Sequence, residues 1–147
     1  MKSFVFPALL LTGMCMPILA QSQSNTAIAQ YKRNKTESPK VIVLINSAAW
    51  CGVCKANGPR VEKNVVSSYM MNPDYQIVVN DLTDDITRAK SNTMLAEAGI
   101  TDFAASTKST GMIYFLKAEN KKLITSISVA ESDAEIKNTF DSCIKKS

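Results

Sequence analysis

An apolar run that leads into two closely spaced cysteines is the feature that most restricts how this chain can fold. Residues 41–45 read Val-Ile-Val-Leu-Ile, and Cys51 and Cys54 follow shortly after. Such a run is typical of a strand buried on both faces of a sheet. If a helix begins at Cys51, free amides and the helix dipole favour its thiolate, and Cys54 lies close enough to form a disulfide. The pattern therefore predicts a pair suited to reversible disulfide chemistry.

The composition limits the chemistry that these cysteines can take part in. The chain has 147 residues, no histidine and a formal net charge of +4. Without histidine, Cys-His and Ser-His nucleophile pairs and imidazole metal sites are excluded. Lysines and acids are interleaved without a long basic block, so we expect a soluble surface and no nucleic-acid partner.

The N-terminus has the features of a secretory signal peptide. Lys2 precedes an apolar segment over residues 4–11, and Ile18-Leu19-Ala20 offers a cleavage site after Ala20. We therefore predict a signal peptide over residues 1–20 and a single mature domain over residues 21–147. The protein is then periplasmic or secreted, with no stable membrane span after cleavage.

Two alternatives for this N-terminus remain open. One is an uncleaved membrane anchor, which is disfavoured because Pro7, Gly13 and Pro17 interrupt the apolar stretch. The other is a lipid-modified Cys15, for which Met14 is an unfavourable preceding residue. Export would place the cysteine pair where disulfides form and persist.

Cys143 is left without a partner if Cys51 pairs with Cys54 and the signal peptide is removed. Ile136, Phe140 and Ile144 recur around Cys143 at helical spacing. We therefore expect a small buried core residue. The alternative is a reactive or intermolecular thiol.

The remaining patterns predict alternating helices and strands, and therefore an α/β fold in which a central mixed β-sheet is flanked by helices on both faces. Asp84 or Asp85 is expected to cap one helix and Gly99 to end it. Helices are predicted over residues 26–34, 51–71, 84–98 and 131–145, strands over 41–46, 75–80, 111–116 and 123–129, and a Ser/Thr-rich loop over 101–110.

Residues 50–55, Trp-Cys-Gly-Val-Cys-Lys, resemble the active-site signature of the thioredoxin superfamily. Pro59 lies where that family has its helix-kinking proline, and the element order is similar over residues 25–146. Among members, the chain looks most like exported thioredoxin-like domains such as the C-terminal periplasmic domain of the DsbD reductase. Residues 49–51 and 79–83 carry this closer similarity.

The resemblance implies a thioredoxin-like fold and a role for each cysteine. Cys51 would be the exposed nucleophile that attacks a substrate disulfide, and Cys54 the buried resolving thiol, with the two forming the redox disulfide. Trp50 would pack beside them, and no cofactor or metal would be needed. The implied partners are protein thiols and disulfides, with a membrane-bound redox protein restoring one state.

Three neighbours of the cysteines have less certain roles. Gly52 and Val53 carry neither charge nor imidazole, unlike the same positions in strongly oxidising family members. We therefore expect a moderate or reducing potential. Lys55 either adds a positive charge near the thiolate or points to solvent.

The chain departs from the family pattern at three places. Ile45 replaces the buried acid that helps to deprotonate the resolving cysteine of thioredoxins. Thr110 holds the place of the cis-proline, and we expect a trans peptide there because a non-proline cis bond costs about 2.5–4 kcal/mol. The loop from Gly99 to Thr110 is longer than its equivalent and is either a partner-selecting element beside the active site or a tolerated insertion.

The sequence therefore favours an exported thiol-disulfide oxidoreductase, acting as reductase, isomerase or electron relay through a mixed disulfide. Two alternatives remain. One is a non-catalytic binding module with a static disulfide. The other is a chaperone that binds a soft metal through both thiolates, although the histidine of such proteins is missing.

Overall fold

The computed structural model describes residues 38–147, so the predicted signal peptide and the helix expected over residues 26–34 lie outside the described part of the chain. Within it, strands and helices alternate as the sequence predicts. The elements are β1 (Val41–Ser47), α1 (Gly52–Val61), the π-helix η1 (Glu62–Val66), α2 (Ser67–Tyr69), β2 (Tyr75–Asp81), α3 (Asp85–Ala98), α4 (Thr101–Ser106), β3 (Met112–Lys117), β4 (Leu123–Ser128) and α5 (Asp133–Ile144).

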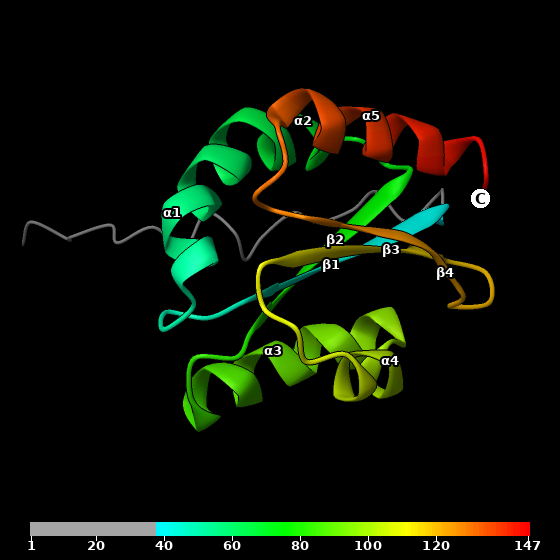
Figure 1. Ribbon diagram of the computed structural model, residues 1–147. Coiled ribbons are helices and arrows are strands. Elements are labelled where there is room, and N and C mark those ends of the chain that lie inside the picture. Colours follow the sequence, from blue (N-terminus) through cyan, green and yellow to red (C-terminus); the bar gives the residue numbers. More distant parts are fainter. Residues whose placement is uncertain (1–37) are drawn as a thin grey trace, which may run out of the picture. The chain divides into compact units, whose positions relative to one another are not determined.

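The four strands form one mixed sheet in the order β2-β1-β3-β4 (Figure 1). β1 runs parallel to β2, with Leu44 opposite Val78, and antiparallel to β3, with Leu44 opposite Tyr114. β3 and β4 form an antiparallel hairpin. Helices α1, α2 and α5 cover one face and α3 and α4 the other (Figure 1). This arrangement confirms the predicted α/β fold.

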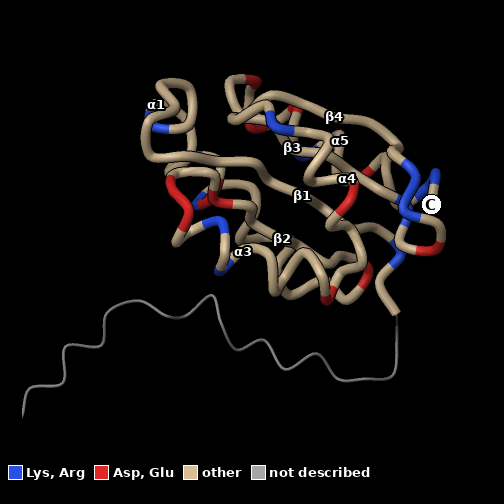
Figure 2. The backbone as a smooth tube through the Cα atoms, turned by 90° about the horizontal axis from the view of Figure 1, so that it is seen from below, with Lys and Arg blue, Asp and Glu red and all other residues tan. Residues whose placement is uncertain are grey.

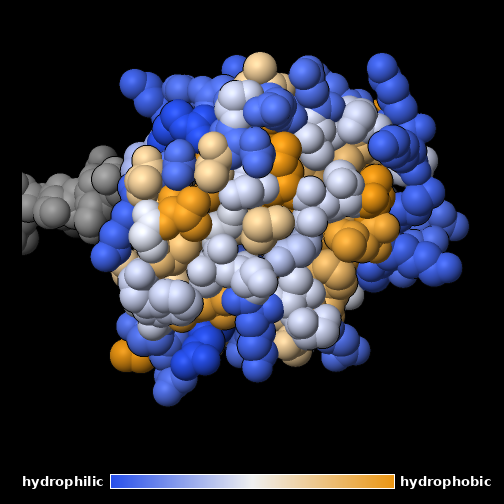
Figure 3. All heavy atoms as spheres, viewed as in Figure 1, coloured by the Kyte–Doolittle hydropathy of each residue, from blue (hydrophilic) through white to orange (hydrophobic). Residues whose placement is uncertain are grey.

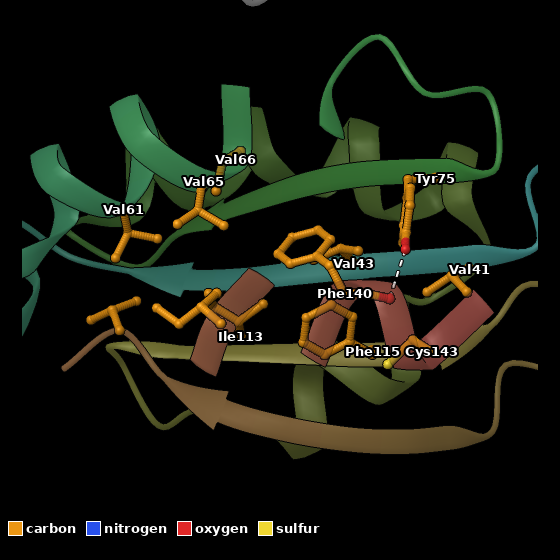
Figure 4. Close-up of a cluster of buried hydrophobic side chains, with 12 residues drawn as sticks. Val41, Val43, Val61, Val65, Val66, Tyr75, Ile113, Phe115, Phe140 and Cys143 are labelled. Atoms are coloured by element: carbon orange, nitrogen blue, oxygen red, sulfur yellow. Dashed lines mark hydrogen bonds between the residues drawn. The ribbon is translucent and has the colours of Figure 1, made fainter. Parts of the chain in front are cut away.

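β1 is apolar without alternation because both of its faces are buried. Val41 and Val43 pack with Phe115 and Phe140 under α1 and α5 (Figure 4). Ile42 and Leu44, the intervening residues, pack under α3 and α4. Each of these residues of β1 is 0% exposed. The central strand is therefore held by hydrophobic contacts on both sides, which fixes the position of the segment that follows it.

Cys143 belongs to the same core as Phe140 and is fully buried without a disulfide partner (Figure 4). Burial raises the pKa of its thiol. The prediction of a buried structural cysteine is therefore confirmed. A raised pKa favours the protonated thiol, which is the less reactive form.

The helix after the cysteine pair continues beyond Pro59. Pro59 has no amide hydrogen to donate, yet the amide of Glu62 bonds to the carbonyls of Gly58 and Pro59. The chain then passes through the π-helical η1 into α2, which ends at Tyr69. The backbone irregularity predicted at Pro59 therefore lies just after it, as a π-helical turn.

Helix α3 begins and ends at the predicted residues. Asp84 accepts a hydrogen bond from the amide of Thr87, whose hydroxyl bonds back to the amide of Asp84. Gly99 ends the helix with a φ of 67°, a left-handed conformation that glycine adopts readily. None of the helices in residues 38–147 is long and apolar enough to cross a membrane.

The prediction of a loop over residues 101–110 is wrong in its first half, because residues 101–106 form α4. Ile100 is 1% exposed and Ala104 6%, so one side of this short helix is buried beneath the sheet. Phe103 packs edge-on against Tyr114, with ring centroids 5.7 Å apart. Tertiary packing thus overrides the low helix propensity of the Ser and Thr residues.

Candidate active site

Cys51 and Cys54 form a disulfide where β1 leads into α1, with their Cα atoms 5.3 Å apart. Cys51 is the N-cap residue of α1, and its Sγ accepts a hydrogen bond of 3.2 Å from the amide of Cys54. This confirms the predicted helix start at the pair. After reduction, the amide and the helix dipole would stabilise a thiolate at Cys51.

The two cysteines are almost equally buried, with 5% of Cys51 and 8% of Cys54 exposed. They form a small apolar cluster with Ala48, against which Val53 and Leu82 pack. The expectation of an exposed nucleophile beside a buried partner is therefore wrong for this disulfide-bonded form. The physical reason is that this apolar cluster packs around both cysteines, and the turn before Cys51 is closed by a hydrogen bond of 3.1 Å from its amide to the carbonyl of Ala48.

One side of the disulfide, which we call the packed flank, consists of Val53, Gly111 and Val129. Gly111 has a φ of 74°, and a Cβ added there would overlap Val53 Cγ1 and lie 3.6 Å from Cys54 Sγ. Its amide donates to the carbonyl of Asn46 at 2.8 Å, and its carbonyl accepts from the amide of Val129 at 2.9 Å. Only glycine fits this position, because both the conformation and the space exclude a side chain.

Gly111, which directly follows Thr110, packs against the disulfide. The β1–β3 pairing and the Gly111–Asn46 hydrogen bond fix the position of Gly111, and the assignment of Thr110 to the place of the family's cis-proline stays a prediction. All peptide bonds among residues 38–147 are trans, that of Thr110 included. The sequence signal that could have found the position is the glycine directly before the third strand.

Arg60, near the other end of α1, holds the packed flank through hydrogen bonds and an ion pair. Its Nη2 donates to the carbonyls of Val129 and Glu131 at 2.8 and 2.9 Å. Its Nη1 forms an ion pair with Asp133. Asn64 also donates to Asp133, at 2.9 Å, and these two partners hold the pKa of that carboxyl below its usual value, the Asn64 hydrogen bond contributing most. The helix that carries the cysteines is thus tied to the segment that supports Gly111.

The other side, which we call the tryptophan flank, consists of Ala49, Trp50, Asp81 and Thr83. The indole of Trp50 is 62% exposed and donates to the carbonyl of Thr83 at 3.3 Å. The hydroxyl of Thr83 accepts from the amide of Ala49 at 2.8 Å and donates to Asp81 at 2.5 Å. Thr83 is the residue that fixes the loop of Trp50, and the packing of the indole beside the cysteines stays a prediction. Sequence reasoning missed this role, although residues 79–83 contributed to the resemblance.

The other predicted site residues of α1 lie at the surface. Gly52, Lys55 and Pro59 are exposed on α1. Ile45, in place of the family's buried acid, packs against the core under α1 and α5. No described residue therefore supplies a carboxylate at that position to assist Cys54.

The surface around the site is mixed in character. Figure 2 shows acidic residues where β2 leads into α3, the segment that carries Asp81, Asp84 and Asp85. On the face shown in Figure 3, hydrophobic residues form separate small patches among polar ones. The large apolar side chains that are exposed are Trp50, Met70, Met71, Ile86, Met94 and Leu123.

Metal ligands are sparse in the described part of the chain. No three His, Cys, Asp or Glu side chains of residues 38–147 come together as a metal site. Cys51 and Cys54 offer two sulfurs, and in this form both are engaged in the disulfide.

No protein-family model matches the chain, and no curated protein matches it in sequence. The chain does match solved structures. A candidate protein disulfide isomerase from Bacteroides thetaiotaomicron has 20% identity and a TM-score of 0.50, over 74% of this chain and 76% of the other. A secreted disulfide oxidoreductase from Mycobacterium tuberculosis, homologous to E. coli DsbE, has 16% identity and a TM-score of 0.46, over 71% and 83%. StoA from Bacillus subtilis has 9% identity and a TM-score of 0.47, over 70% and 84%. The four-stranded mixed sheet, its helices on both faces and the likeness to the Bacteroides protein identify the fold of this chain as the thioredoxin-like α/β fold.

Proposed function

We propose that this chain is an exported thiol-disulfide oxidoreductase. It uses Cys51 and Cys54 to reduce or isomerise protein disulfides, or to relay electrons to them. The observation that carries the proposal is the disulfide at the start of α1, with the amide of Cys54 directed at Cys51 Sγ. A thiolate needs this kind of environment to be formed and to react. The pattern of residues 1–20 supports export.

The proposed reaction starts from the reduced pair. The Cys51 thiolate attacks one sulfur of a substrate disulfide, the substrate S–S bond breaks, and the released thiolate takes up a proton. The thiolate of Cys54 then attacks the Cys51 sulfur of the mixed disulfide. This step forms the Cys51–Cys54 bond and releases the second substrate thiol. The substrate gains two electrons and the pair loses two, so a thiol reductant, which we propose to be a membrane-bound redox protein, must reduce the pair again.

The residues between the cysteines bear on the direction of this exchange. Gly52 and Val53 offer no charge to stabilise the reduced thiolate, so the reduced form lacks the extra stabilisation that makes a strong oxidant. We therefore propose a reduction potential between about −180 and −270 mV, the range from isomerases to thioredoxin.

A second candidate function is a binding module in which the disulfide is static. The low exposure of Cys51 and Cys54 favours it, since a disulfide enclosed in apolar contacts is less accessible to external thiols. The missing carboxylate at Ile45 points the same way. The two candidates differ in the potential and in the accessibility of the reduced thiols.

A redox titration of the purified protein against glutathione and dithiothreitol separates them, followed by the fluorescence of Trp50, which is the single tryptophan. A potential in the range given above supports an oxidoreductase. A value below about −300 mV, or no titration, supports a static disulfide. As a matched pair of variants, Cys54→Ser should accumulate a mixed disulfide with a substrate, whereas Cys51→Ser should not.

A further inference from the structure

Two buried asparagines lie at the carboxyl ends of β1 and β2, on the sheet face covered by α3 and α4. Asn46 is 0% exposed and Asn80 3%, and they are paired across the two parallel strands. The side-chain amide of Asn80 donates to Asn46 Oδ1 at 2.9 Å. Two buried amides are costly unless their hydrogen bonds are made, so the bonds of this pair in a largely apolar layer repay a closer look at what they hold.

Asn46 holds both ends of the segment that connects α4 to β3. Its side-chain Nδ2 donates to the carbonyl of Thr107 at 2.5 Å, where the segment begins. Its backbone carbonyl accepts the amide of Gly111 at 2.8 Å, where the segment ends. The bond from Asn80 fixes the orientation of the Asn46 amide. Asn46 therefore contributes a contact at each end of residues 107–111.

The end of this segment lies against one sulfur of the pair in particular. A Cβ on Gly111 would lie 3.6 Å from Cys54 Sγ, and the three nearest atoms include none of Cys51. Gly111 thus packs against the proposed resolving cysteine. Which sulfur an incoming thiol can reach is one of the factors that decide the rate and outcome of disulfide exchange.

We propose that Asn46 is a positioning residue for the cysteine pair: held by Asn80, it anchors residues 107–111 so that Gly111 packs against Cys54 and limits thiol exchange at this sulfur when the pair is reduced. The catalytic consequence rests on the proposed function, whereas the shielding can be measured in a protein with no activity. Asn46 itself makes no contact with a reacting sulfur and acts through the segment that it holds.

Asn46→Leu tests the shielding directly. The fully reduced protein is treated briefly with iodoacetamide, and peptide mapping by mass spectrometry gives the ratio of label on Cys54 to label on Cys51. We expect Asn46→Leu to raise this ratio about five- to tenfold, the factor that corresponds to the loss of one buried hydrogen bond.

Val78→Ala is the matched control. Val78 is 3% exposed on β2 and packs in the same apolar layer, so its truncation destabilises that layer without touching residues 107–111. The proposal requires a changed labelling ratio in Asn46→Leu and an unchanged one in Val78→Ala. Equal ratios in wild type and Asn46→Leu, or ratios that rise in both variants with their loss of stability, would overturn it.

Asn80→Leu keeps the experiment decisive if Asn46→Leu does not fold. It leaves the Asn46 amide in place but removes the bond that orients it, so we expect a smaller rise in Cys54 labelling. An unchanged ratio in this variant would also contradict the proposal. Reduction of insulin by the same proteins separates the two proposals: a changed ratio without activity in the wild type rejects the oxidoreductase function and leaves the shielding intact.

Discussion

The disulfide has two unlike flanks. On the packed flank, Gly111 meets Val53 and Val129 without room for a single further carbon atom. On the tryptophan flank, the indole of Trp50 is 62% exposed, and hydrogen bonds to Thr83 hold its loop. The first flank is fixed by van der Waals contact and the second by polar contacts at the surface.

The difference assigns the two flanks different tasks. Close packing tolerates almost no change in volume, so the packed flank is suited to shield sulfur and to keep a single geometry. An exposed aromatic side chain on a fixed loop keeps a large apolar surface available, so the tryptophan flank is suited to contact a substrate. On the proposed function, we expect a polypeptide substrate to lie against Trp50 rather than against Gly111.

Gly111→Ala should break the packed flank and have the largest effect. A left-handed conformation costs a non-glycine residue about 1–2 kcal/mol, and overpacking against Val53 adds about 1–3 kcal/mol. We therefore expect a loss of about 2–5 kcal/mol in the free energy of unfolding, measured by urea denaturation of the disulfide-bonded protein.

The clash can be separated from the backbone strain by a double variant. Val53→Ala removes the atom that the new Cβ would overlap. In that background, Gly111→Ala should therefore lose only the stability that the backbone strain costs, without the loss caused by overpacking. A coupling energy of about 1–3 kcal/mol between the two substitutions is expected. Strictly additive losses would show that the two residues do not press on each other.

Local patterns explain what the sequence predicted correctly. The apolar residues 41–45 predict the central strand, Asp84 and Gly99 predict the ends of α3, and Cys51 predicts the start of α1, because each signal acts within a few residues. The chemistry of the pair follows from the same helix end. These features could be predicted from the sequence without knowledge of the tertiary contacts.

Long-range contacts explain what the sequence did not predict. α4 forms because Ile100 and Ala104 are buried against the sheet, which the Ser and Thr residues around them do not reveal. The position of Gly111 against the disulfide depends in part on its hydrogen bond to Asn46, which is distant in sequence. Thr83 also acts on a loop far along the chain. The roles of such residues become apparent only when the pairing of the strands is known.

Thr83→Val should loosen the tryptophan flank with a smaller effect. Valine keeps the shape of threonine but loses the hydroxyl bonds to Ala49 and Asp81, which we expect to cost about 1 kcal/mol because the site is only partly buried. Trp50 fluorescence should then respond less to reduction of the disulfide, and the KM for a peptide disulfide should rise. Thr83→Ser retains the hydroxyl and serves as the control. A KM that is unchanged in Thr83→Val would argue against a substrate surface on this flank.

Asp133→Asn should have the smallest effect on stability, because it removes only the charge of the ion pair between Asp133 and Arg60, which supports the packed flank. Hydrogen bonds from Asn64 and Arg60 and the charge of Arg60 hold the pKa of Asp133 below its usual value in the folded protein. A carboxyl with a lowered folded pKa adds stability above its unfolded pKa of about 3.9, and this contribution is lost as the pH falls through the folded value. Asparagine lacks the charge at every pH. Urea midpoints of wild type and variant should therefore differ at pH 7 and converge in acid, while Asp84, whose pKa is also lowered, titrates in both proteins and cancels. A difference in urea midpoint that stays constant down to pH 2 would show that the interaction of Arg60 with residue 133 depends on shape and not on charge.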